Sequence, residues 1–339
     1  MSKKNLSVNL KNGFNNFKDL SNIFFDFKNK LDNLKKKSYT VAVSGGPDSL
    51  ALVALTKAYS YTKTVKFHYV LVNHNIRKNS SQEANQVKNL LKKKKINLVI
   101  ILNKKKIIKN IQGQARNIRY KILSDFCKKK RVSTLLTAHN LEDQVETFFI
   151  RLSRGSGLKG LSAMNYLSKI GNNVNLYRPL LETKKKFLIK ISKNIFGKYI
   201  RDPSNKNEKY LRTKIRNLKK PLEKSGIEYD QIIRSIKNLA SSKMTLDLHF
   251  KEIFNEMIKK NKKEILVNFD KLKKFNREIK MAIINESVRQ LKKNYYSIRS
   301  KKICDLINKF ENAKFKQATL GGCIFTIKKG NLCLKAEKT

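Results

Sequence analysis

A short run of small and polar residues has the composition of an anion-binding turn. The run consists of Ser44, Gly45, Gly46, Pro47, Asp48 and Ser49. Its glycines tolerate positive φ and let the backbone approach an oxyanion, and Pro47 suits the first position of a helix, where no amide donor is needed. Free amides and the dipole of the following helix would attract phosphate, and Ser44 and Ser49 would add hydroxyl donors.

This run differs from the commoner phosphate-binding loop. That loop has the pattern G-x-x-x-x-G-K-[ST], in which a lysine reaches the outer phosphates. No such lysine follows Gly46. The run is therefore predicted to hold a pyrophosphate without being built to transfer the terminal phosphoryl group. The alternative is an ordinary turn between a strand and a helix.

Two carboxylates form the second candidate group. Asp143 and Glu146 lie in the run A-H-N-L-E-D-Q-V-E-T at 138–147, and a spacing of three makes them neighbours on one face of a helix. Next to a nucleotide site, such a pair would hold a cation or an ammonium group. The alternative is that both residues only suit the dipole in the first turn of their helix.

The elements that must position these groups alternate along the chain. Apolar runs predict four strands, at 40–43, 66–72, 96–102 and 132–137. Each is followed by a predicted helix, at 49–60, 81–94, 112–129 and 141–153. This alternation predicts an α/β fold in which a parallel sheet is covered by helices on both faces. Ligands of such sheets bind beyond the carboxyl ends of the strands, where the loop and the carboxylates should meet.

The chain is expected to contain three segments. Residues 1–217 would form the α/β domain with a leading helix, and residues 218–313 a lysine-rich helical domain. Residues 314–339 would form a short β hairpin, since two apolar runs flank the turn residues at 328–331.

Charge and composition limit the partners. The formal net charge of +51 predicts attraction to polyanions such as nucleic acid, although part of it could be the codon bias of an AT-rich genome. Four cysteines without a C-x-x-C pair argue against a metal site, a cluster or a disulfide framework. With no signal peptide and no apolar run of membrane-spanning length, we expect a cytoplasmic protein without a membrane partner.

Taken together, the motifs resemble the tRNA(Ile)-lysidine synthase family of the PP-loop ATPases, also called N-type ATP pyrophosphatases. They occur in the family's order: S-G-G-P-D-S (44–49), N-H-N-I-R (73–77), S-Q-E-A (81–84), I-Q-G-Q-A-R-N-I-R-Y (111–120), A-H-N-L-E-D-Q-V-E-T (138–147), R-G-S-G-L-K-G-L (154–161), R-P-L (178–180) and D-P-S-N (202–205). The L-G-G run at 320–322 is similar to the family's C-terminal part. Two positions differ, because the family usually has aspartate at Asn73 and a pair of aspartates at Glu142 and Asp143.

The resemblance implies an ATP-dependent ligase that joins free lysine to the wobble cytidine of an isoleucine tRNA with a CAU anticodon. The 2-carbonyl oxygen of the base would attack the α-phosphate of ATP, pyrophosphate would leave, and the lysine ε-amine would then displace AMP. Phosphate contacts would come from the 154–159 loop and the helical domain.

The resemblance also implies roles for individual residues. ATP would be held by Ser44, Gly45, Gly46, Pro47, Asp48 and Ser49, with His139 on the nucleotide or the base. His139 could equally be a structural histidine that makes a hydrogen bond. Asp48 would help with Mg²⁺ or its water shell, since Mg²⁺ takes few protein carboxylates. Asp143 and Glu146 would hold the lysine ammonium, and Arg116 would bind a phosphate or the lysine carboxylate, unless it is a solvated helix arginine.

Two other functions fit parts of the pattern. A thiolase of the same superfamily would need paired cysteines, which the chain lacks. A non-catalytic RNA-binding protein on a decayed ATPase scaffold would explain Asn73, but the intact loop, Arg116, Asp143 and Glu146 argue against it.

Overall fold

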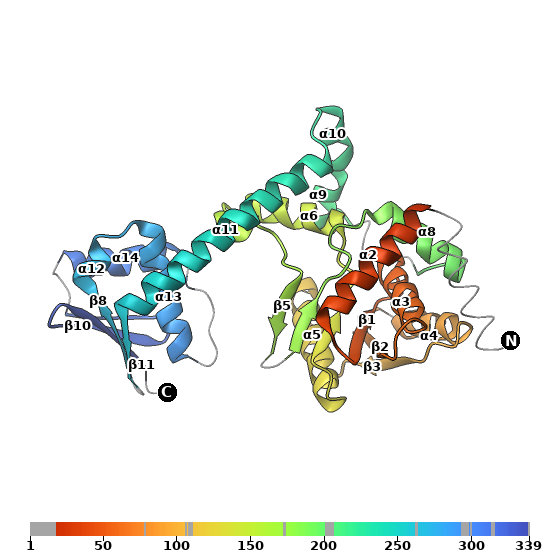
Figure 1. The fold of residues 1–339 in the computed structure, drawn as a ribbon, viewed down its shortest axis with the longest axis horizontal. Coiled ribbons are helices and arrows are strands. Elements are labelled where there is room, and N and C mark those ends of the chain that lie inside the picture. The colour runs from red at the N-terminus through yellow and green to blue at the C-terminus, as the bar shows by residue number, and fades with distance from the viewer. Residues whose placement is uncertain are drawn as a thin grey trace. The chain divides into compact units, whose positions relative to one another are not determined.

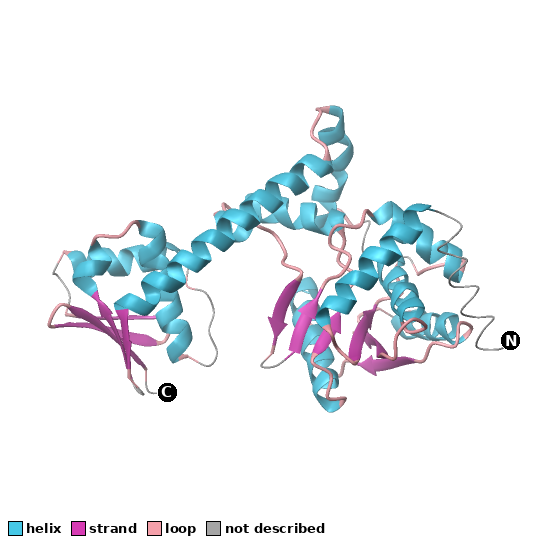
Figure 2. Cartoon of the chain, viewed as in Figure 1, coloured by secondary structure: helices cyan, strands magenta, loops and turns pink. Residues whose placement is uncertain are grey.

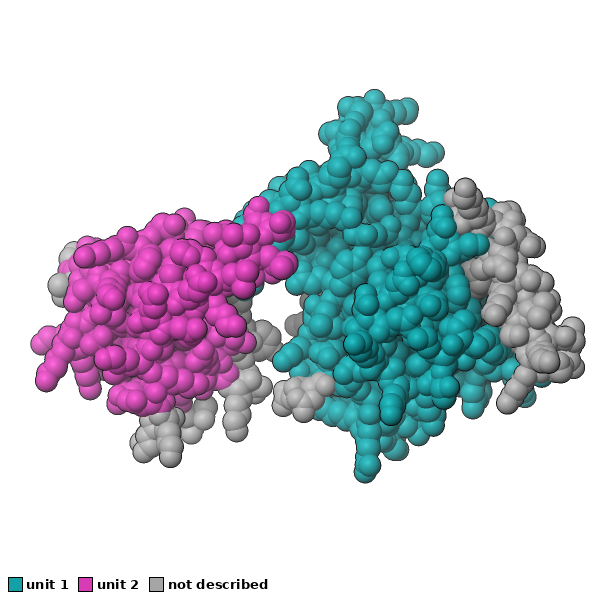
Figure 3. Space-filling model, in the orientation of Figure 1, with its two compact units in different colours: residues 1–240 teal, residues 241–339 magenta. Residues whose placement is uncertain are grey.

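The computed structural model describes residues 18–77, 79–105, 107, 111–171, 174–200, 207–261, 264–292, 298, 300–312 and 316–337. The D-P-S-N run and the first part of the expected leading helix lie outside these residues. The chain forms two compact units, residues 1–240 and 241–339 (Figure 3). In the described part of the chain, no helix combines the length and the apolar composition that crossing a membrane requires.

The first unit is built on a six-stranded sheet in the order β3-β2-β1-β4-β6-β5 (Figure 1). Its strands are β1 (Ser38–Val43), β2 (Lys66–Asn73), β3 (Leu98–Leu102), β4 (Thr134–Leu136), β5 (Leu167–Ile170) and β6 (Val174–Tyr177). All neighbouring pairs are parallel except β5 and β6. The predicted α/β fold is therefore confirmed, and the antiparallel strand lies at one edge.

Helices cover both faces of this sheet (Figure 2). They are α2 (Lys18–Leu34), α3 (Pro47–Tyr59), α4 (Ser80–Lys92), α5 (Ile111–Lys129) and α8 (Lys185–Phe196). Successive strand residues enter different cores: Leu71 and Leu136 pack with α3, α4 and α8, whereas Val70 and Leu135 pack with α5. This alternation is the two-residue period of a strand that is buried on both sides.

A smaller cluster fixes the position of the carboxylate-bearing helix. Leu141 and Val145 of α6 (Leu141–Leu152) pack against Tyr229 and Ile232 in the first part of α11 (Tyr229–Met257). Three short helices complete this region, namely α7 (Leu158–Leu161), α9 (Leu211–Asn217) and α10 (Lys219–Lys224). Helix α9 packs directly on α6, which brings its side chains to the carboxylates.

The second unit has its own core and a five-stranded antiparallel sheet in the order β7-β8-β11-β10-β9. Its strands are β7 (Ile258–Lys260), β8 (Glu264–Asn268), β9 (Gln317–Leu320), β10 (Cys323–Lys328) and β11 (Asn331–Ala336). The helices α12 (Phe269–Lys273), α13 (Arg277–Leu291) and α14 (Ser300–Glu311) accompany the sheet.

The two units differ from the three segments expected from the sequence. The hairpin of β10 and β11 turns between Lys328 and Asn331, where the turn was predicted. However, β8 pairs with β11, so the hairpin shares one sheet with a strand inside the expected helical domain. Ile265 and Val267 alternate with partly buried neighbours in β8, and a strand pattern this short is difficult to recognise in a lysine-rich stretch.

Candidate active site

The glycine loop joins the end of β1 to the start of α3. Gly45 has φ +83°, and a Cβ at this position would lie 2.5 Å from Val87 Cγ2, so the loop geometry requires glycine. Gly46 is the N-cap of α3, and no side chain caps the helix. A Cβ on Gly46 would meet Ser44 Oγ only at 3.7 Å. The first turn of α3 is therefore open to an anion, which its amides and dipole would attract.

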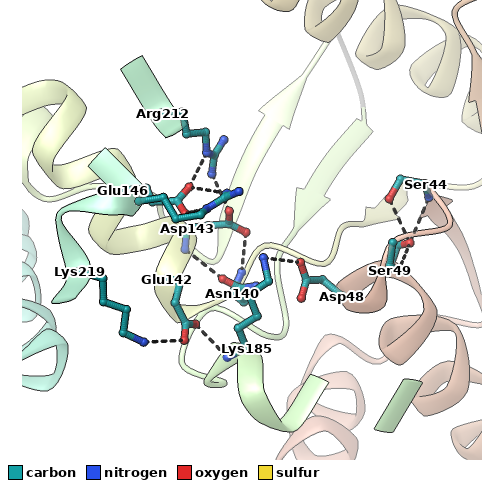
Figure 4. Close-up of polar contacts among 12 residues, drawn as sticks. Ser44, Asp48, Ser49, Asn140, Glu142, Asp143, Glu146, Lys185, Arg212 and Lys219 are labelled. Carbon is teal, nitrogen blue, oxygen red and sulfur yellow. Dashed lines mark hydrogen bonds and ion pairs between the residues drawn. The ribbon is translucent and has the colours of Figure 1, made fainter. Parts of the chain in front are cut away.

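Ser49 maintains the shape of this loop. Its Oγ accepts hydrogen bonds from Ser44 N at 3.2 Å and from Ser44 Oγ at 3.1 Å, and donates to the Gly46 carbonyl at 3.0 Å (Figure 4). Both hydroxyls are thus engaged with the loop itself. The sequence predicts donors to a ligand, whereas here Ser44 Oγ donates to Ser49 Oγ and only Ser49 Oγ donates to the backbone of the loop.

Asp48 is a largely buried carboxylate with an unsatisfied oxygen. Its Oδ1 has no hydrogen-bond partner among the described residues, and its Oδ2 lies 3.7 Å from Lys185 Nζ at the start of α8. Burial raises the pKa of Asp48 to about 6, the Lys185 ammonium opposes this rise, and the negative charge of Asp143 adds to it. A cation at Oδ1 would favour the ionised form.

These features fit Mg²⁺ bound mainly through a nucleotide. In the described ranges, no group of three or more His, Cys, Asp or Glu side chains could hold a metal ion by itself. Magnesium commonly uses one or two carboxylates together with phosphates and water. Asp48, with its free oxygen beside the open turn of α3, is the residue that would hold it.

Asn140 and Asp143 cap helix α6 reciprocally. Asp143 N donates to Asn140 Oδ1 at 2.9 Å, and Asn140 N donates to Asp143 Oδ2 at 3.1 Å. This capping box satisfies amides that the helix would leave free. One of the two Asp143 oxygens therefore serves the terminus of its own helix.

The second oxygen of Asp143 and both oxygens of Glu146 bind arginines. Arg212 donates from Nη2 to Asp143 Oδ1 at 2.5 Å and from Nε to Glu146 Oε2 at 2.6 Å. Arg216 Nε donates to Glu146 Oε1 at 2.7 Å. The side chain of Glu146 is only 2% exposed, so it needs these partners. The two carboxylates therefore meet as the helical spacing predicts, and in this structure guanidinium groups occupy them, so their role in holding an ammonium group stays a prediction.

Glu142 links the same helix to α8. Its Oε2 accepts a hydrogen bond from Lys185 N at 2.8 Å, and its Oε1 lies 4.0 Å from Lys219 Nζ. Helix α8 has no side-chain cap of its own at Lys184, so the Glu142 carboxylate stabilises the positive N-terminal end of the α8 dipole. The contact positions Lys185, whose ammonium faces Asp48.

His139 follows β4, and Arg116 of α5 lies close enough for its charge to act on the imidazole. His139 Nδ1 is 3.0 Å from Thr137 Oγ1. Burial lowers the pKa of His139 well below its usual value, and the positive charges of Arg178 and Arg116 lower it further, so the imidazole is neutral at pH 7. The Arg116 guanidinium lies 5.1 Å from the ring centroid of Tyr120.

A family model described as a PP-loop domain matches residues 20–222. The tRNA(Ile)-lysidine synthase of Wolbachia pipientis wMel is 33% identical over 288 residues, which cover 84% of this chain and 67% of that protein. The chain belongs to the tRNA(Ile)-lysidine synthase family.

Other relatives support this membership. The tRNA(Ile)-lysidine synthase of Rickettsia typhi is 30% identical and the match covers 92% of this chain and 73% of that protein. Among solved structures, the U34-tRNA thiolase NcsA from Methanococcus maripaludis with its [4Fe-4S] cluster has a TM-score of 0.56 and 21% identity, covering 65% of this chain and 79% of that one. This likeness shows a common fold.

Asn73, which departs from the lysidine synthase pattern, has a structural role here. It is buried at the end of β2, where its Nδ2 donates to Ser81 Oγ at 3.0 Å and its Oδ1 accepts from Asn75 N at 2.9 Å. Asn75 has φ +53°, so the amide stabilises a tight turn after the strand. Both ends of the Asn73 side chain are therefore satisfied without a charge.

Three site residues were not singled out from the lysidine synthase motifs. Arg212 and Arg216 are four apart on α9, a spacing that places them on one face of that helix, and the packing of α9 on α6 turns this face to the carboxylates. Lys185 belongs to none of these motifs, and only the packing of α8 on α3 brings it to Asp48.

Proposed function

We propose that this protein joins free lysine to the wobble cytidine of an isoleucine tRNA with a CAU anticodon, through an adenylated cytidine, with release of AMP and pyrophosphate. Family membership makes it an ATP-using ligase that acts on tRNA. The observation that carries the proposal is the open first turn of α3, with the unsatisfied Asp48 oxygen beside it. A terminus without a side-chain cap and a carboxylate with one oxygen outside any hydrogen bond both favour a bound, metal-associated polyphosphate.

In the first step, the cytidine 2-carbonyl oxygen attacks the α-phosphorus of ATP. A new phosphorus–oxygen bond forms, the bond to the bridging oxygen breaks, and pyrophosphate leaves with the electron pair. Amides of the turn at Gly46 would stabilise the charge on the departing group. Lys185 lies beside Asp48 and would add positive charge at the same place. Mg²⁺, when bound, would supply further charge neutralisation on the phosphates.

In the second step, the lysine ε-ammonium gives up a proton to solvent and the resulting neutral ε-amine attacks C2 of the activated base. A carbon–nitrogen bond forms, the bond from C2 to the oxygen breaks, and AMP leaves with that oxygen. We keep Asp143 and Glu146 as the residues that receive the lysine ammonium. The bridging guanidinium of Arg212 supports this assignment, since a cation already lies across the pair. An ammonium would take the place of Arg212 on Asp143, while Arg216 would continue to balance Glu146. The Arg212 side chain is 35% exposed, so it can move without opening the core.

The alternatives make different use of the substrates. A thiolase would be indifferent to lysine, and a non-catalytic RNA-binding protein would release no pyrophosphate. Pyrophosphate release should therefore be measured with tRNA and lysine present together and with each omitted. We expect sustained, multiple-turnover release only with both substrates and ATP, together with a gain of the mass of a lysine residue at the wobble cytidine. Without lysine, release should stop after about one pyrophosphate per enzyme, because the adenylated cytidine is not consumed. Multiple-turnover release that does not depend on lysine would refute the proposal.

A further inference from the structure

Three arginines converge next to the site without a carboxylate to balance them. Arg116 and Arg119 lie on α5, and their guanidinium carbons are 5.1 and 5.5 Å from the ring centroid of Tyr120. Arg178 follows β6, next to Thr137, whose amide donates to the Tyr177 carbonyl at 3.0 Å. Among the described residues, no ion pair joins any of these three arginines to an acidic side chain.

Arg178 is the least exposed of the three arginines. Its side chain is buried, with the residue only 6% exposed, and Nη1 donates to the Asn165 carbonyl at 2.8 Å and to Ser168 Oγ at 3.0 Å. Its Nε is buried and has no hydrogen-bond partner in the part of the chain that the structure describes, and the buried Tyr120 hydroxyl lies beside the guanidinium groups of Arg178 and Arg119. A buried donor without an acceptor is costly, and an oxyanion would satisfy it.

The charges of this group repel one another. Burial lowers the pKa of Arg178 and of Arg119, and the positive charge of Arg116 lowers both further. Burying several guanidinium groups without a counter-charge is unfavourable unless a bound anion balances them. His139 is neutral here and offers no negative charge. The anion must therefore come from a ligand.

The position of the group indicates which ligand this is. In the sheet, β4 separates β6 from β1, whose loop would hold the polyphosphate of ATP. Two strand spacings are about 10 Å, so Arg178 lies on the side away from the nucleotide loop. A guanidinium packed on an aromatic ring is also a common feature of sites that hold splayed, single-stranded nucleotides.

We propose that Arg116, Arg119 and Arg178 form a binding site for the RNA backbone, which takes the phosphodiester next to the base that is modified. This inference rests on the proposed function, since it identifies the RNA as the tRNA substrate. Arg178 Nε and the Tyr120 hydroxyl would donate to one phosphate. Arg116 and Arg119 would remain stacked on Tyr120 and add charge, which holds the nucleotide at the edge of the sheet. The site would fix the strand so that the base reaches the α-phosphate of ATP.

Binding of a tRNA transcript with a CAU anticodon tests the site without turnover. Affinity should be measured over a range of KCl concentrations for the wild type, Arg119→Gln and Arg178→Gln. We expect each variant to bind about ten-fold more weakly, with a salt slope lower by about 0.7, the value for one lost contact to a single strand. Arg119→Lys should restore the salt slope because it keeps the charge. Arg131→Gln is the matched control, since Arg131 is exposed and precedes the N-terminal end of β4, whereas the proposed site lies at the carboxyl ends of the strands.

Further measurements distinguish an RNA phosphate from the two other anions that this site could bind, the lysine carboxylate and ATP. In Arg119→Gln, the ATP affinity and the KM for lysine should be unchanged. If Arg178→Gln does not fold, this variant alone still tests whether the group binds RNA. A raised KM for lysine with normal tRNA binding would assign the group to the lysine carboxylate, and weaker ATP binding would assign it to the nucleotide. Either result would overturn the proposal. A wild type that binds tRNA with the expected slope but forms no lysidine would refute the function and leave the RNA contact standing.

Discussion

Arg212 Nε lies 2.6 Å from Glu146 Oε2, although 66 residues separate the two in the sequence. The contact joins α9 to α6 and places a guanidinium across the carboxylates proposed for lysine. It stabilises the site in this conformation and also occupies it. Substrate binding and the stability of this helix pair are therefore expected to be coupled through the same carboxylates.

Glu146→Gln should destabilise the first unit. The substitution removes the buried negative charge that pairs with Arg216 and, together with Asp143, with Arg212. Breaking such a buried pair costs on the order of 3 kcal/mol. Denaturant unfolding measures the loss. Asp26→Asn is the control, because Asp26 is 57% exposed in its pair with Lys30 and should contribute less than about 1 kcal/mol. Equal effects of the two variants would show that the burial of Glu146 does not govern its contribution.

Asp143→Asn should impair the use of lysine and leave ATP binding mostly intact. Asparagine keeps an oxygen that can accept from Asn140 N, so the cap of α6 is retained while the charge is lost. We expect the KM for lysine to rise by at least about ten-fold, the loss of roughly one charged hydrogen bond. The ATP dissociation constant, measured by calorimetry, should change little. Parallel losses of ATP and lysine binding would contradict the ammonium assignment.

Asp48 should make stability depend on pH in a characteristic direction. Its pKa is raised in the folded state to about 6, so the folded protein binds this proton more tightly than the unfolded chain does. The protonated form favours folding, and this contribution is lost as the pH rises from about 4 through 6. Asp48→Asn should therefore be more stable than the wild type at pH 7, and the difference should vanish near pH 4. Urea unfolding at both pH values tests this, and a constant difference would argue against the raised pKa.

The two loop glycines should respond differently to alanine. Gly45→Ala forces a side chain into positive φ and onto Val87, which should cost about 1–3 kcal/mol of stability. Gly46→Ala meets no close contact in the protein and should fold normally. If the turn holds ATP, the new methyl group should still weaken ATP binding, because the backbone must approach the phosphates. Normal ATP affinity in Gly46→Ala would place the nucleotide elsewhere.

The sequence alone determined the parts of the fold that depend on neighbouring residues. The four parallel strands, the helices between them and the turn at Gly45 follow from local period and local backbone freedom. The closeness of Asp143 and Glu146 follows from helical spacing. The second unit was harder to predict, since β8 is short and its partner β11 lies about seventy residues further along.

Only the tertiary structure decided what these groups contact. No local pattern shows that Arg212 reaches Asp143, that Lys185 faces Asp48 across 137 residues of sequence, or that Arg178 joins Arg116 and Arg119 around Tyr120. Such pairs form because helices and strands bury their apolar faces together, and that packing carries the charged side chains with it. The residue types therefore indicate the chemistry of the site, while its charge balance is set by contacts between distant segments.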